Sequence, residues 1–344
     1  MSAAATLPSV RPLDAAAARA AAQRQAQLIK PPGALGRLEE LAVWVAGVTG
    51  DPRPDPRARI VVAAADHGVT AQGVSAYPQA VTAQMLAAFD AGHAAIAVLA
   101  GHTEADLVLV DAGVIDPPAV PAVAAGLPAP SADLSREAAL SAEQLEHALG
   151  LGRSLAAQAA GDGVHLLVGG EMGIGNTTPA ACVAAALTGA SPAAVAGRGT
   201  GLDDAGLERK RAVIARALDV HAGALDDPLE VLRCVGGGEL AVLCGLALGA
   251  GEHGLGYLCD GVIATAAVAV AVALQPDLRP RLLAAHRSTE PGHGLLLGWL
   301  GLDPLLDLGL HLGEGSGAAT ALLLVAAACR LHDGMATFAE AGVG

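Results

Sequence analysis

Four uninterrupted apolar runs restrict what this chain can fold into more than any other feature of its sequence. They read RIVVAAADHG, LVLVDAG, VHLLVGGEMG and LGYLCDG, and each ends in an acidic or glycine-rich turn. A strand with one face in water alternates apolar and polar residues, whereas a strand covered on both faces is continuously apolar. The four runs therefore predict strands that are buried on both faces.

Helical patterns separate these runs, for example over Val81–Leu99 and Ala142–Ala159. Strands that alternate with helices form a parallel sheet with right-handed crossovers. Hydrophobic residues make up 53% of the chain and aromatic residues only 2%, so the core consists of Ala, Val and Leu, which suits helices packed closely on a sheet. We predict an α/β fold built on a parallel sheet with helices on both faces.

Proline-rich segments mark the organisation of the chain. The first fifty residues read as a helix, the loop KPPGALG and a second helix through Trp44, and GDPRPDPRAR then breaks the pattern. A chain of 344 residues exceeds the usual span of one hydrophobic core, which favours a large domain with a smaller appendage. The proline-rich segment Ile115–Ser135 is expected to be an extended surface loop inside the large domain.

Composition and charge exclude several classes of protein. A net charge of −14 argues against a nucleic-acid surface, which needs a basic stripe. The apolar runs, such as Val262–Leu274, fall short of the ~20 residues of a membrane span and are expected to be buried helices. The N-terminus shows no secretory signal, so we expect a cytoplasmic protein. Five cysteines lie far apart in mostly apolar stretches, as expected of buried, reduced thiols.

Acidic residues follow the predicted strands. Asp66, Asp111, Glu171 and Asp260 stand at their carboxyl ends, where ligands bind in open parallel sheets. The alternative is that these acids only cap the segments that follow them, and for Asp111 we favour that interpretation. The strand ends are therefore the first place to look for a site.

The stretch GGEMGIGNTT lies between a predicted strand and the helical run AACVAAALTG. Glycines there allow the backbone to approach a ligand, and unpaired N–H groups at the start of a helix favour an anion such as phosphate. The stretch lacks the Gly-Lys-Ser/Thr ending of a P-loop, and it departs from the dinucleotide-binding pattern. A tight structural turn is the alternative interpretation.

Three further stretches carry candidate chemistry. GRGTGLDDAGLERK brings Lys210 near a glycine-rich turn, where it would hold a phosphate, although a solvated helix face is the default. HRSTEPGHG offers a metal site only if His286 and His293 converge, and Pro291 favours a turn instead. In HLGEGSGAA, glycines on both sides leave the carboxylate of Glu314 bare, which makes it either solvated or a proton acceptor.

Six stretches, in order from Lys30 to about Ala319, resemble one family closely. They are KPPGALGRLEELA, AADHGVTAQGVSAYPQAVTAQM, GGEMGIGNTTPA, GRGTGLDDAGLERK, STEPGHGLLL and GLHLGEGSGAA. On these motifs the chain resembles the nicotinate-nucleotide:dimethylbenzimidazole phosphoribosyltransferases of cobalamin biosynthesis. Six motifs in one order are far more specific than a single glycine loop.

The resemblance implies a fold and a reaction. It implies a homodimer with a Rossmann-like large domain, 51–314, and a small helical domain made of 1–50 and 315–344. The implied reaction moves the phosphoribosyl group of nicotinate mononucleotide to 5,6-dimethylbenzimidazole and yields α-ribazole 5′-phosphate and nicotinate. The leaving pyridine departs as a neutral ring, so the reaction requires no metal and no cofactor.

The resemblance also implies roles for individual residues. Glu314 matches the catalytic base of the family. Ligands of the ribose or phosphate are expected at Glu171, Gly173, Gly175, Asn176, Thr177 and Thr178, with Lys210 as a weaker phosphate contact. The base pocket is expected to include Ser75 and Gln84, and the turn around Glu314 adds Gly313, Gly315 and Ser316 to the substrate-binding residues.

Two other functions remain open at this point. A catalytically silent module that senses mononucleotides would need the phosphate loop but has no use for a bare carboxylate such as Glu314. An oxidoreductase of the Rossmann type is disfavoured because the dinucleotide fingerprint and its distal acid are absent. Product analysis distinguishes the sensing module from a transferase. A test of NAD binding distinguishes the oxidoreductase from both.

Overall fold

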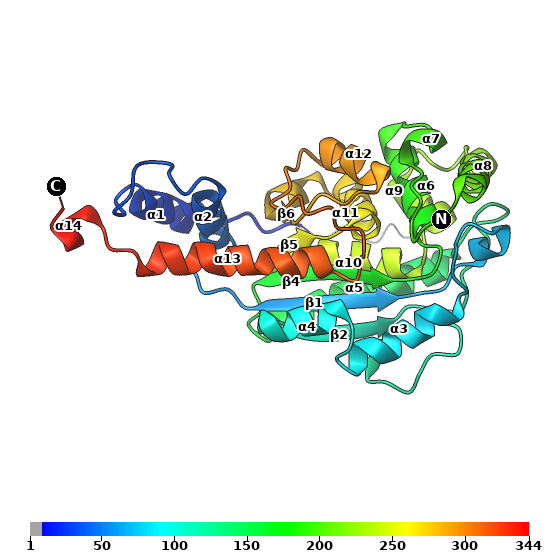
Figure 1. Ribbon diagram of the computed structural model, residues 1–344, viewed down its shortest axis with the longest axis horizontal. Coiled ribbons are helices and arrows are strands. Elements are labelled where there is room, and N and C mark those ends of the chain that lie inside the picture. Colours follow the sequence, from blue (N-terminus) through cyan, green and yellow to red (C-terminus); the bar gives the residue numbers. More distant parts are fainter. Residues whose placement is uncertain (1–8, 344) are drawn as a thin grey trace.

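A six-stranded parallel sheet forms the centre of the molecule (Figure 1), in a computed structural model that describes residues 9–343. Its strand order is β3-β2-β1-β4-β5-β6, which is the order of doubly wound dinucleotide-binding folds. The Rossmann-like α/β fold is therefore confirmed. The strands are β1 (Ala58–Ala64), β2 (Asp106–Asp111), β3 (Ala122–Ala124), β4 (Leu166–Met172), β5 (Gly256–Cys259) and β6 (Leu282–Ala284).

Four of these strands coincide with the predicted apolar runs, and two do not. Both unpredicted strands, β3 and β6, are three residues long and lie at the two edges of the sheet. The segment Ile115–Ser135, expected to be an extended surface loop, also contains the short strand β3, which pairs with β2. Three residues are too few to show a periodicity, so neither strand has a signal in the sequence.

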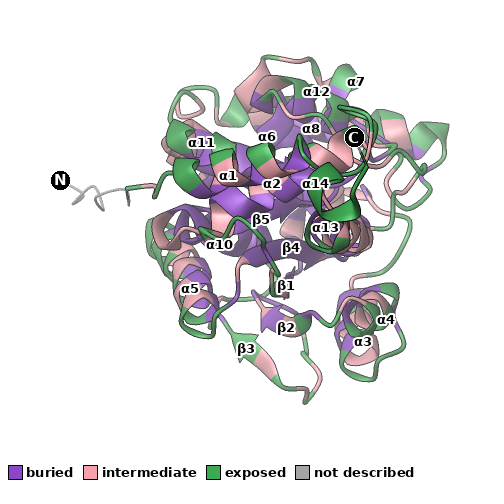
Figure 2. Ribbon diagram, turned by 90° about the vertical axis from the view of Figure 1, so that its left-hand side faces the viewer, coloured by how far each residue is buried: buried purple, intermediate pink, exposed green. Residues whose placement is uncertain are grey.

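Helices cover both faces of the sheet, which explains the continuous apolar runs. Helices α3 (Ala80–Asp90), α4 (Ala95–His102) and α13 (Ser316–Gly334) lie on one side, and α5 (Ala142–Gly161), α10 (Gly238–His253) and α11 (Val262–Leu274) lie on the other. In β1, Ile60 and Val62 pack into the apolar cluster on the first side, whereas Val61 packs into the cluster on the second. Successive side chains of a strand point to opposite faces, so each face needs its own apolar residues. Figure 2 shows the buried interior running through β4, β5 and α10.

The longer helices agree with most of the predicted patterns, including the buried helix at Val262–Leu274. They are α1 (Ala15–Gln25), α2 (Arg37–Thr49), α3 (Ala80–Asp90), α4 (Ala95–His102), α5 (Ala142–Gly161), α6 (Thr177–Thr188), α8 (Asp204–Val220), α9 (Pro228–Val235), α10 (Gly238–His253), α11 (Val262–Leu274), α12 (Pro291–Leu300) and α13 (Ser316–Gly334). Short helical segments are α7 (Pro192–Val195), α14 (Phe338–Ala341), η1 (Gly68–Gln72) and η2 (Pro276–Arg281). The five cysteines are free and buried, as predicted.

The helical pattern over Val81–Leu99 is interrupted in the structure. It divides into α3 and α4 around Gly92, whose φ of 76° ends the first helix. By length and composition alone, Ala80–His102 is apolar enough to cross a membrane, although every apolar run had been expected to fall short of a span. Because two separate helices share this segment, that signal is weak.

Helices from the two ends of the chain, α1 and α2 with α14 and the last turns of α13, lie together at one end of the molecule (Figure 1). There α1 and α2 pack against each other, and α2 packs against α13. The backbone also joins the two ends, since the N–H of Ile29 donates to Ala336 and that of Phe338 donates to Gln27. Helix α13 is continuous from this end to the sheet, where it contacts β4. A separate domain of 1–50 with 315–344 stays a prediction.

Candidate active site

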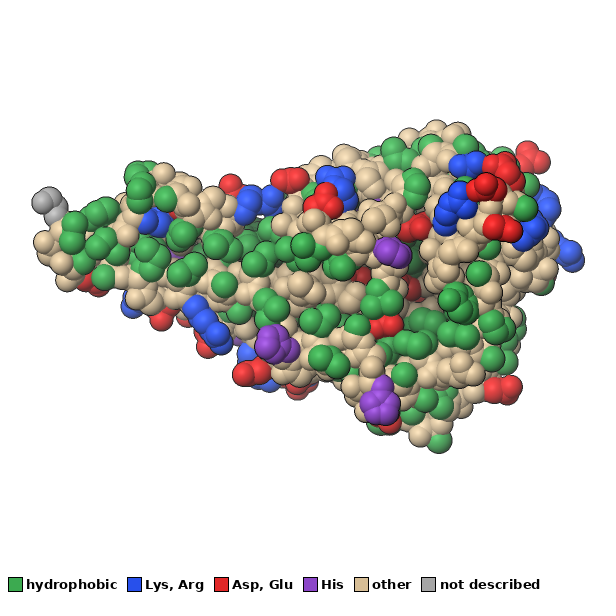
Figure 3. Space-filling model, viewed as in Figure 1, with side chains coloured by type: hydrophobic (Ala, Val, Ile, Leu, Met, Phe, Trp, Pro, Cys, Tyr) green, Lys and Arg blue, Asp and Glu red, His purple; other side chains and the backbone are tan. Residues whose placement is uncertain are grey.

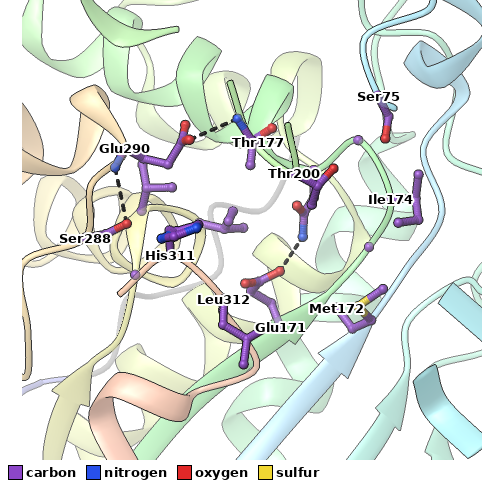
Figure 4. A pocket seen from close by; sticks show the side chains of 18 of the residues that line it. Ser75, Glu171, Met172, Ile174, Thr177, Thr200, Ser288, Glu290, His311 and Leu312 are labelled. Carbon is purple, nitrogen blue, oxygen red and sulfur yellow. Dashed lines mark hydrogen bonds between the residues drawn. The ribbon is translucent and has the colours of Figure 1, made fainter. Parts of the chain in front are cut away.

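A cavity opens at the carboxyl ends of β4, β5 and β6, and offers about 90 Å³ to water (Figure 4). This is the edge where the sequence predicted a site. Segments from six parts of the chain line the cavity: 74–75, 171–177, 198–202, 261–263, 286–290 and 311–313. The site is therefore assembled by the sheet rather than by any one motif.

The glycine-rich loop after β4 forms one wall of this cavity. Gly175 has a φ of 90°, a conformation that favours glycine, and it leads into α6. Asn176 is the N-cap residue of α6, but its side chain does not cap the helix, because Nδ2 donates to Oε2 of Glu171 instead. The start of α6 thus faces the cavity without a side-chain acceptor, which is the arrangement that binds anions.

The loop is also held from behind. The N–H of Ile174 donates to Oγ1 of Thr82 at 3.1 Å, and that hydroxyl donates to Oδ1 of Asp66 at 2.8 Å. Asp66 therefore serves the glycine loop through a buried threonine and does not line the cavity. Asp111 accepts the N–H groups of Gly113 and Val114, so it caps the turn after β2, as predicted.

Glu171 is the acidic group of the cavity wall, and its surroundings favour the protonated form. Burial raises the pKa of Glu171 to about 8, against the opposing hydrogen bond from Asn176, and the nearby carboxylates of Asp260, Glu239 and Glu314 raise it further. At neutral pH this carboxyl is therefore mostly protonated. It can donate a hydrogen bond to a ligand.

Glu314 lies in a turn next to Glu171 and outside the cavity lining. Its backbone φ is 65°, between 86° at Gly313 and 84° at Gly315, and its N–H donates to the carbonyl of Glu171 at 3.2 Å. Burial raises the pKa of Glu314, while the N–H of Ile96 at the start of α4 acts in the opposite direction. The buried Oε2 atom of Glu314 has no hydrogen-bond partner among the described residues. An unpartnered carboxylate oxygen of this kind can accept a proton.

Lys210 supports the cavity wall at the start of α6 from behind. Its Nζ donates to Oγ1 of Thr177 at 2.7 Å and to the carbonyl of Gly197 at 3.0 Å, and burial lowers its pKa to about 8. Nearby, Oε1 of Glu290 accepts the N–H of Gly199 at 2.9 Å (Figure 4). These bonds join the start of α6 to the glycine-rich turn at 197–199.

The expected site residues fall into two groups. Those in the cavity wall are Ser75, Glu171, Gly173, Gly175, Asn176, Thr177 and Gly313. Those outside it are Thr178, Lys210, Glu314, Gly315 and Ser316, which are buried, and Gln84, which is exposed on α3. Roles of both groups in binding stay predictions.

Several cavity residues were not expected from the sequence to bind substrate. They are Arg198, Thr200, His286, Ser288, Glu290 and His311. The stretches GRGTG and HRSTEPGHG were noted as unusual, but STEPG was interpreted as a helix start or turn. Glu290 does precede α12, yet its carboxylate crosses to Gly199 and does not cap that helix.

The two histidines of HRSTEPGHG do not form a metal site. Their rings lie 5.8 Å apart, and burial lowers the pKa of His293 to about 4. Both ring nitrogens of His293 are engaged, one with Thr265 and one with the N–H of Ser288. Across residues 9–343, no three His, Cys, Asp or Glu side chains are placed to hold a metal ion.

Comparisons with known proteins show what the chain is similar to. A family model described as phosphoribosyltransferase matches residues 10–343. A nicotinate-nucleotide–dimethylbenzimidazole phosphoribosyltransferase of Pseudomonas putida (strain W619) is 50% identical over 338 residues, which cover 97% of this chain and 96% of that protein. The protein of the same name from Xanthomonas axonopodis pv. citri is 53% identical over 333 residues, covering 96% and 95%.

Solved structures show the same similarity. The crystal structure of CobT from Thermus thermophilus superimposes with a TM-score of 0.88 at 45% identity, covering 96% of this chain and 99% of that one. A second structure from that organism, described as a nicotinate-nucleotide–dimethylbenzimidazole phosphoribosyltransferase, gives a TM-score of 0.89 at 46% identity with the same coverage. The similarity extends over almost the whole chain.

Proposed function

The chain belongs to this phosphoribosyltransferase family, and from that premise we propose that it transfers the phosphoribosyl group of nicotinate mononucleotide to 5,6-dimethylbenzimidazole. The products are α-ribazole 5′-phosphate and nicotinate. This is a pentosyl transfer that prepares the lower ligand of cobalamin. The names of the relatives at about half identity support the reaction, and the cavity supports the placement of the nucleotide.

The phosphate of the mononucleotide fits the start of α6. Backbone N–H groups and the helix dipole favour an anion there, and Asn176 leaves them without a side-chain acceptor. Thr177 contributes a hydroxyl that Lys210 holds in place. The protonated carboxyl of Glu171 lies in the same wall, where it donates to the ribose or phosphate.

The chemistry needs one proton acceptor. The bond between the ribose C1′ and the pyridinium nitrogen breaks, and the pair of electrons stays on nicotinate, which leaves without needing a proton. The benzimidazole nitrogen forms the new bond to C1′ through its lone pair. Its other nitrogen then loses a proton, and we assign Glu314 as the general base that accepts it.

One observation carries this assignment: the unpartnered, buried Oε2 of Glu314 lies in a turn bonded directly to Glu171. A mononucleotide sensor needs the phosphate loop but gains nothing from such a carboxylate. Incubating the protein with both substrates and analysing the products by mass spectrometry tests the proposal. We expect α-ribazole 5′-phosphate and nicotinate in equal amounts. Binding of the nucleotide without any product would instead support the sensing module.

Further proposals concern the state of the protein in the cell. We propose a homodimer in the cytoplasm that acts without a metal or cofactor. An apolar surface supports the dimer: Figure 3 shows hydrophobic side chains along α13 and over α3 and α4, and Val98 on α4 is 62% exposed. Light scattering after size-exclusion chromatography tests the dimer. Absence of NAD binding would remove the oxidoreductase alternative.

A further inference from the structure

Asp260, directly after β5, reaches the segment that carries Glu314. It is 1% exposed, and both of its carboxylate oxygens accept backbone N–H groups from far along the chain. Oδ2 accepts from Gly315 at 3.2 Å, and Oδ1 accepts from Ala318 at 2.9 Å. Both donors lie at the start of α13.

This pair of bonds replaces an ordinary helix cap. The N-cap residue of α13 is Gly315, which has no side chain to accept the free N–H groups at the start of the helix. Asp260 supplies the acceptor from the end of another strand, and its negative charge is favourable at the positive end of the helix dipole. The start of α13 is thereby fixed to the end of β5.

The turn before α13 depends on such support. Glu314 is a non-glycine residue in the left-handed region, which is unfavourable unless neighbouring bonds hold it there. On one side its own N–H is bonded to Glu171, and on the other side Gly315 is bonded to Asp260. Without Asp260, the backbone of the turn that carries Glu314 would lose its bond on the α13 side.

His286 links this arrangement to the cavity wall. Its Nε2 lies 3.5 Å from Oδ1 of Asp260, and its ring lies so close to Gly317 that a Cβ there would be 2.1 Å from Cδ2. Asp260, the first turn of α13 and a residue of the cavity wall thus form one packed unit. A shift of Asp260 would move the Glu314 turn relative to the bound substrates.

We infer that Asp260 is a positioning residue for Glu314, whose two bonds to the start of α13 hold the carboxylate where the benzimidazole proton is released. Asp260 itself touches neither substrate and acts through the backbone of Gly315 and Ala318. The inference rests on the proposed transferase function and on Glu314 as its base.

The test compares two aspartates that make the same kind of bond. Asp260→Asn keeps the size of the side chain but turns one acceptor into a donor that faces an N–H. We expect kcat to fall about 10- to 100-fold, because small misplacements of a catalytic group have effects of this order. The KM for nicotinate mononucleotide is expected to change less than about threefold, since the 173–177 loop is untouched.

Asp111→Asn is the matched control. Asp111 also follows a strand of the sheet and accepts two backbone N–H groups, from Gly113 and Val114 at 3.0 and 2.9 Å, but it holds a turn remote from Glu314. Its kcat is expected to stay within about twofold of the wild type. Circular dichroism and melting temperatures show whether each variant is folded, and Asp260→Ser replaces Asp260→Asn if the amide is not tolerated.

A double variant separates positioning from a general loss of stability. If Asp260 acts only through Glu314, Asp260→Asn adds no further loss of kcat to a Glu314→Gln enzyme. Additive losses, a kcat equal to that of the Asp111 control, or a raised KM with unchanged kcat would each overturn the inference. If the wild type itself forms no α-ribazole 5′-phosphate, the proposed function fails and not the role of Asp260 alone.

Discussion

Two glycine-rich loops lead into helices beside β4, and they use the start of their helix in opposite ways. The loop 173–176 leads into α6, whose N-cap side chain turns away to Glu171 and leaves the helix start facing the cavity. The loop 313–315 leads into α13, whose first N–H groups are taken by Asp260. The first loop therefore leaves the start of its helix open to a ligand, whereas the second has its helix start bound to the carboxylate of Asp260.

The difference teaches how similar sequences acquire different chemistry. GIGNTT and GEGSG both supply glycines before a helix, but only the second places a carboxylate in the left-handed region with a free oxygen. In the proposed function, binding of substrate belongs to the first loop and acceptance of the proton to the second. Substitutions in the two loops should therefore separate KM from kcat.

Glu314→Gln is expected to have the largest effect. The amide keeps the size of the side chain but cannot accept a proton, so kcat should fall by about 10²- to 10⁴-fold. The KM for the nucleotide should change little, because the phosphate loop is intact. Steady-state kinetics with both substrates varied measures this. Near-normal turnover with collapsed nucleotide binding would make Glu314 a binding residue, with Glu171 as the next candidate for the base.

Asn176→Asp probes the other loop. The side chain of Asn176 does not cap α6 but donates to Glu171, and in the variant the protonated carboxyl of Glu171 can donate instead, so we expect the melting temperature to fall only slightly at neutral pH. The added negative charge at the start of α6 opposes the phosphate and faces the carboxyl of Glu171, so the KM for nicotinate mononucleotide should rise about 10- to 100-fold. The KM for the base should stay near that of the wild type. Equal rises in both KM values would show that the loop does not bind the phosphate.

Glu171→Gln is expected to have a smaller effect, because glutamine resembles the protonated carboxyl that prevails at neutral pH. We expect kcat at pH 7 to stay within about tenfold of the wild type. A loss as large as that of Glu314→Gln would contradict the division between the two loops.

The same variant should differ from the wild type in how its unfolding free energy depends on pH. The folded-state pKa of Glu171 is raised to about 8, so its contribution to stability is present below the unfolded-state value near 4.5 and is lost as pH rises towards 8 and above. Relative to the wild type, Glu171→Gln should therefore gain stability between about pH 6 and pH 9, by on the order of 2 kcal/mol. Urea unfolding of the variant and the wild type at both pH values measures this. If the two proteins differ in unfolding free energy by the same amount at both pH values, the pKa of Glu171 is not raised.

A chelator should have the smallest effect. The reaction as proposed has a neutral leaving group and uses no metal, so EDTA should leave the initial rate unchanged. The assay is the rate of nicotinate release before and after treatment. A complete loss that magnesium restores would reveal a metal requirement.

The sequence predicted the parts of this fold that depend on local pattern. The four longer strands, the helix predicted over Ala142–Ala159 and the buried helix Val262–Leu274 follow from apolar periodicity. The edge strands β3 and β6 did not, because three residues carry no periodicity. The break at Gly92 was also missed, since a single glycine inside an apolar pattern does not by itself end a helix.

The site was predictable where it lies within one motif and less so where distant segments meet. The flanking glycines in HLGEGSGAA predicted that no neighbouring side chain covers the carboxylate of Glu314. The contact with Ile96 and the support from Asp260 could not be predicted in this way, because both come from segments far away in the chain. Lys210 was expected at the phosphate; its Nζ donates to Thr177 behind the cavity wall, and a contact with the phosphate stays a prediction. Tertiary packing decides each of these positions.

A crystal structure with nicotinate mononucleotide and 5,6-dimethylbenzimidazole bound together tests the central claim most directly. The account predicts the phosphate against the backbone N–H groups at the start of α6, and a ring nitrogen of the base within about 3 Å of Oε2 of Glu314. A phosphate bound elsewhere, or a base whose nitrogen faces Glu171 with Glu314 remote, would contradict it.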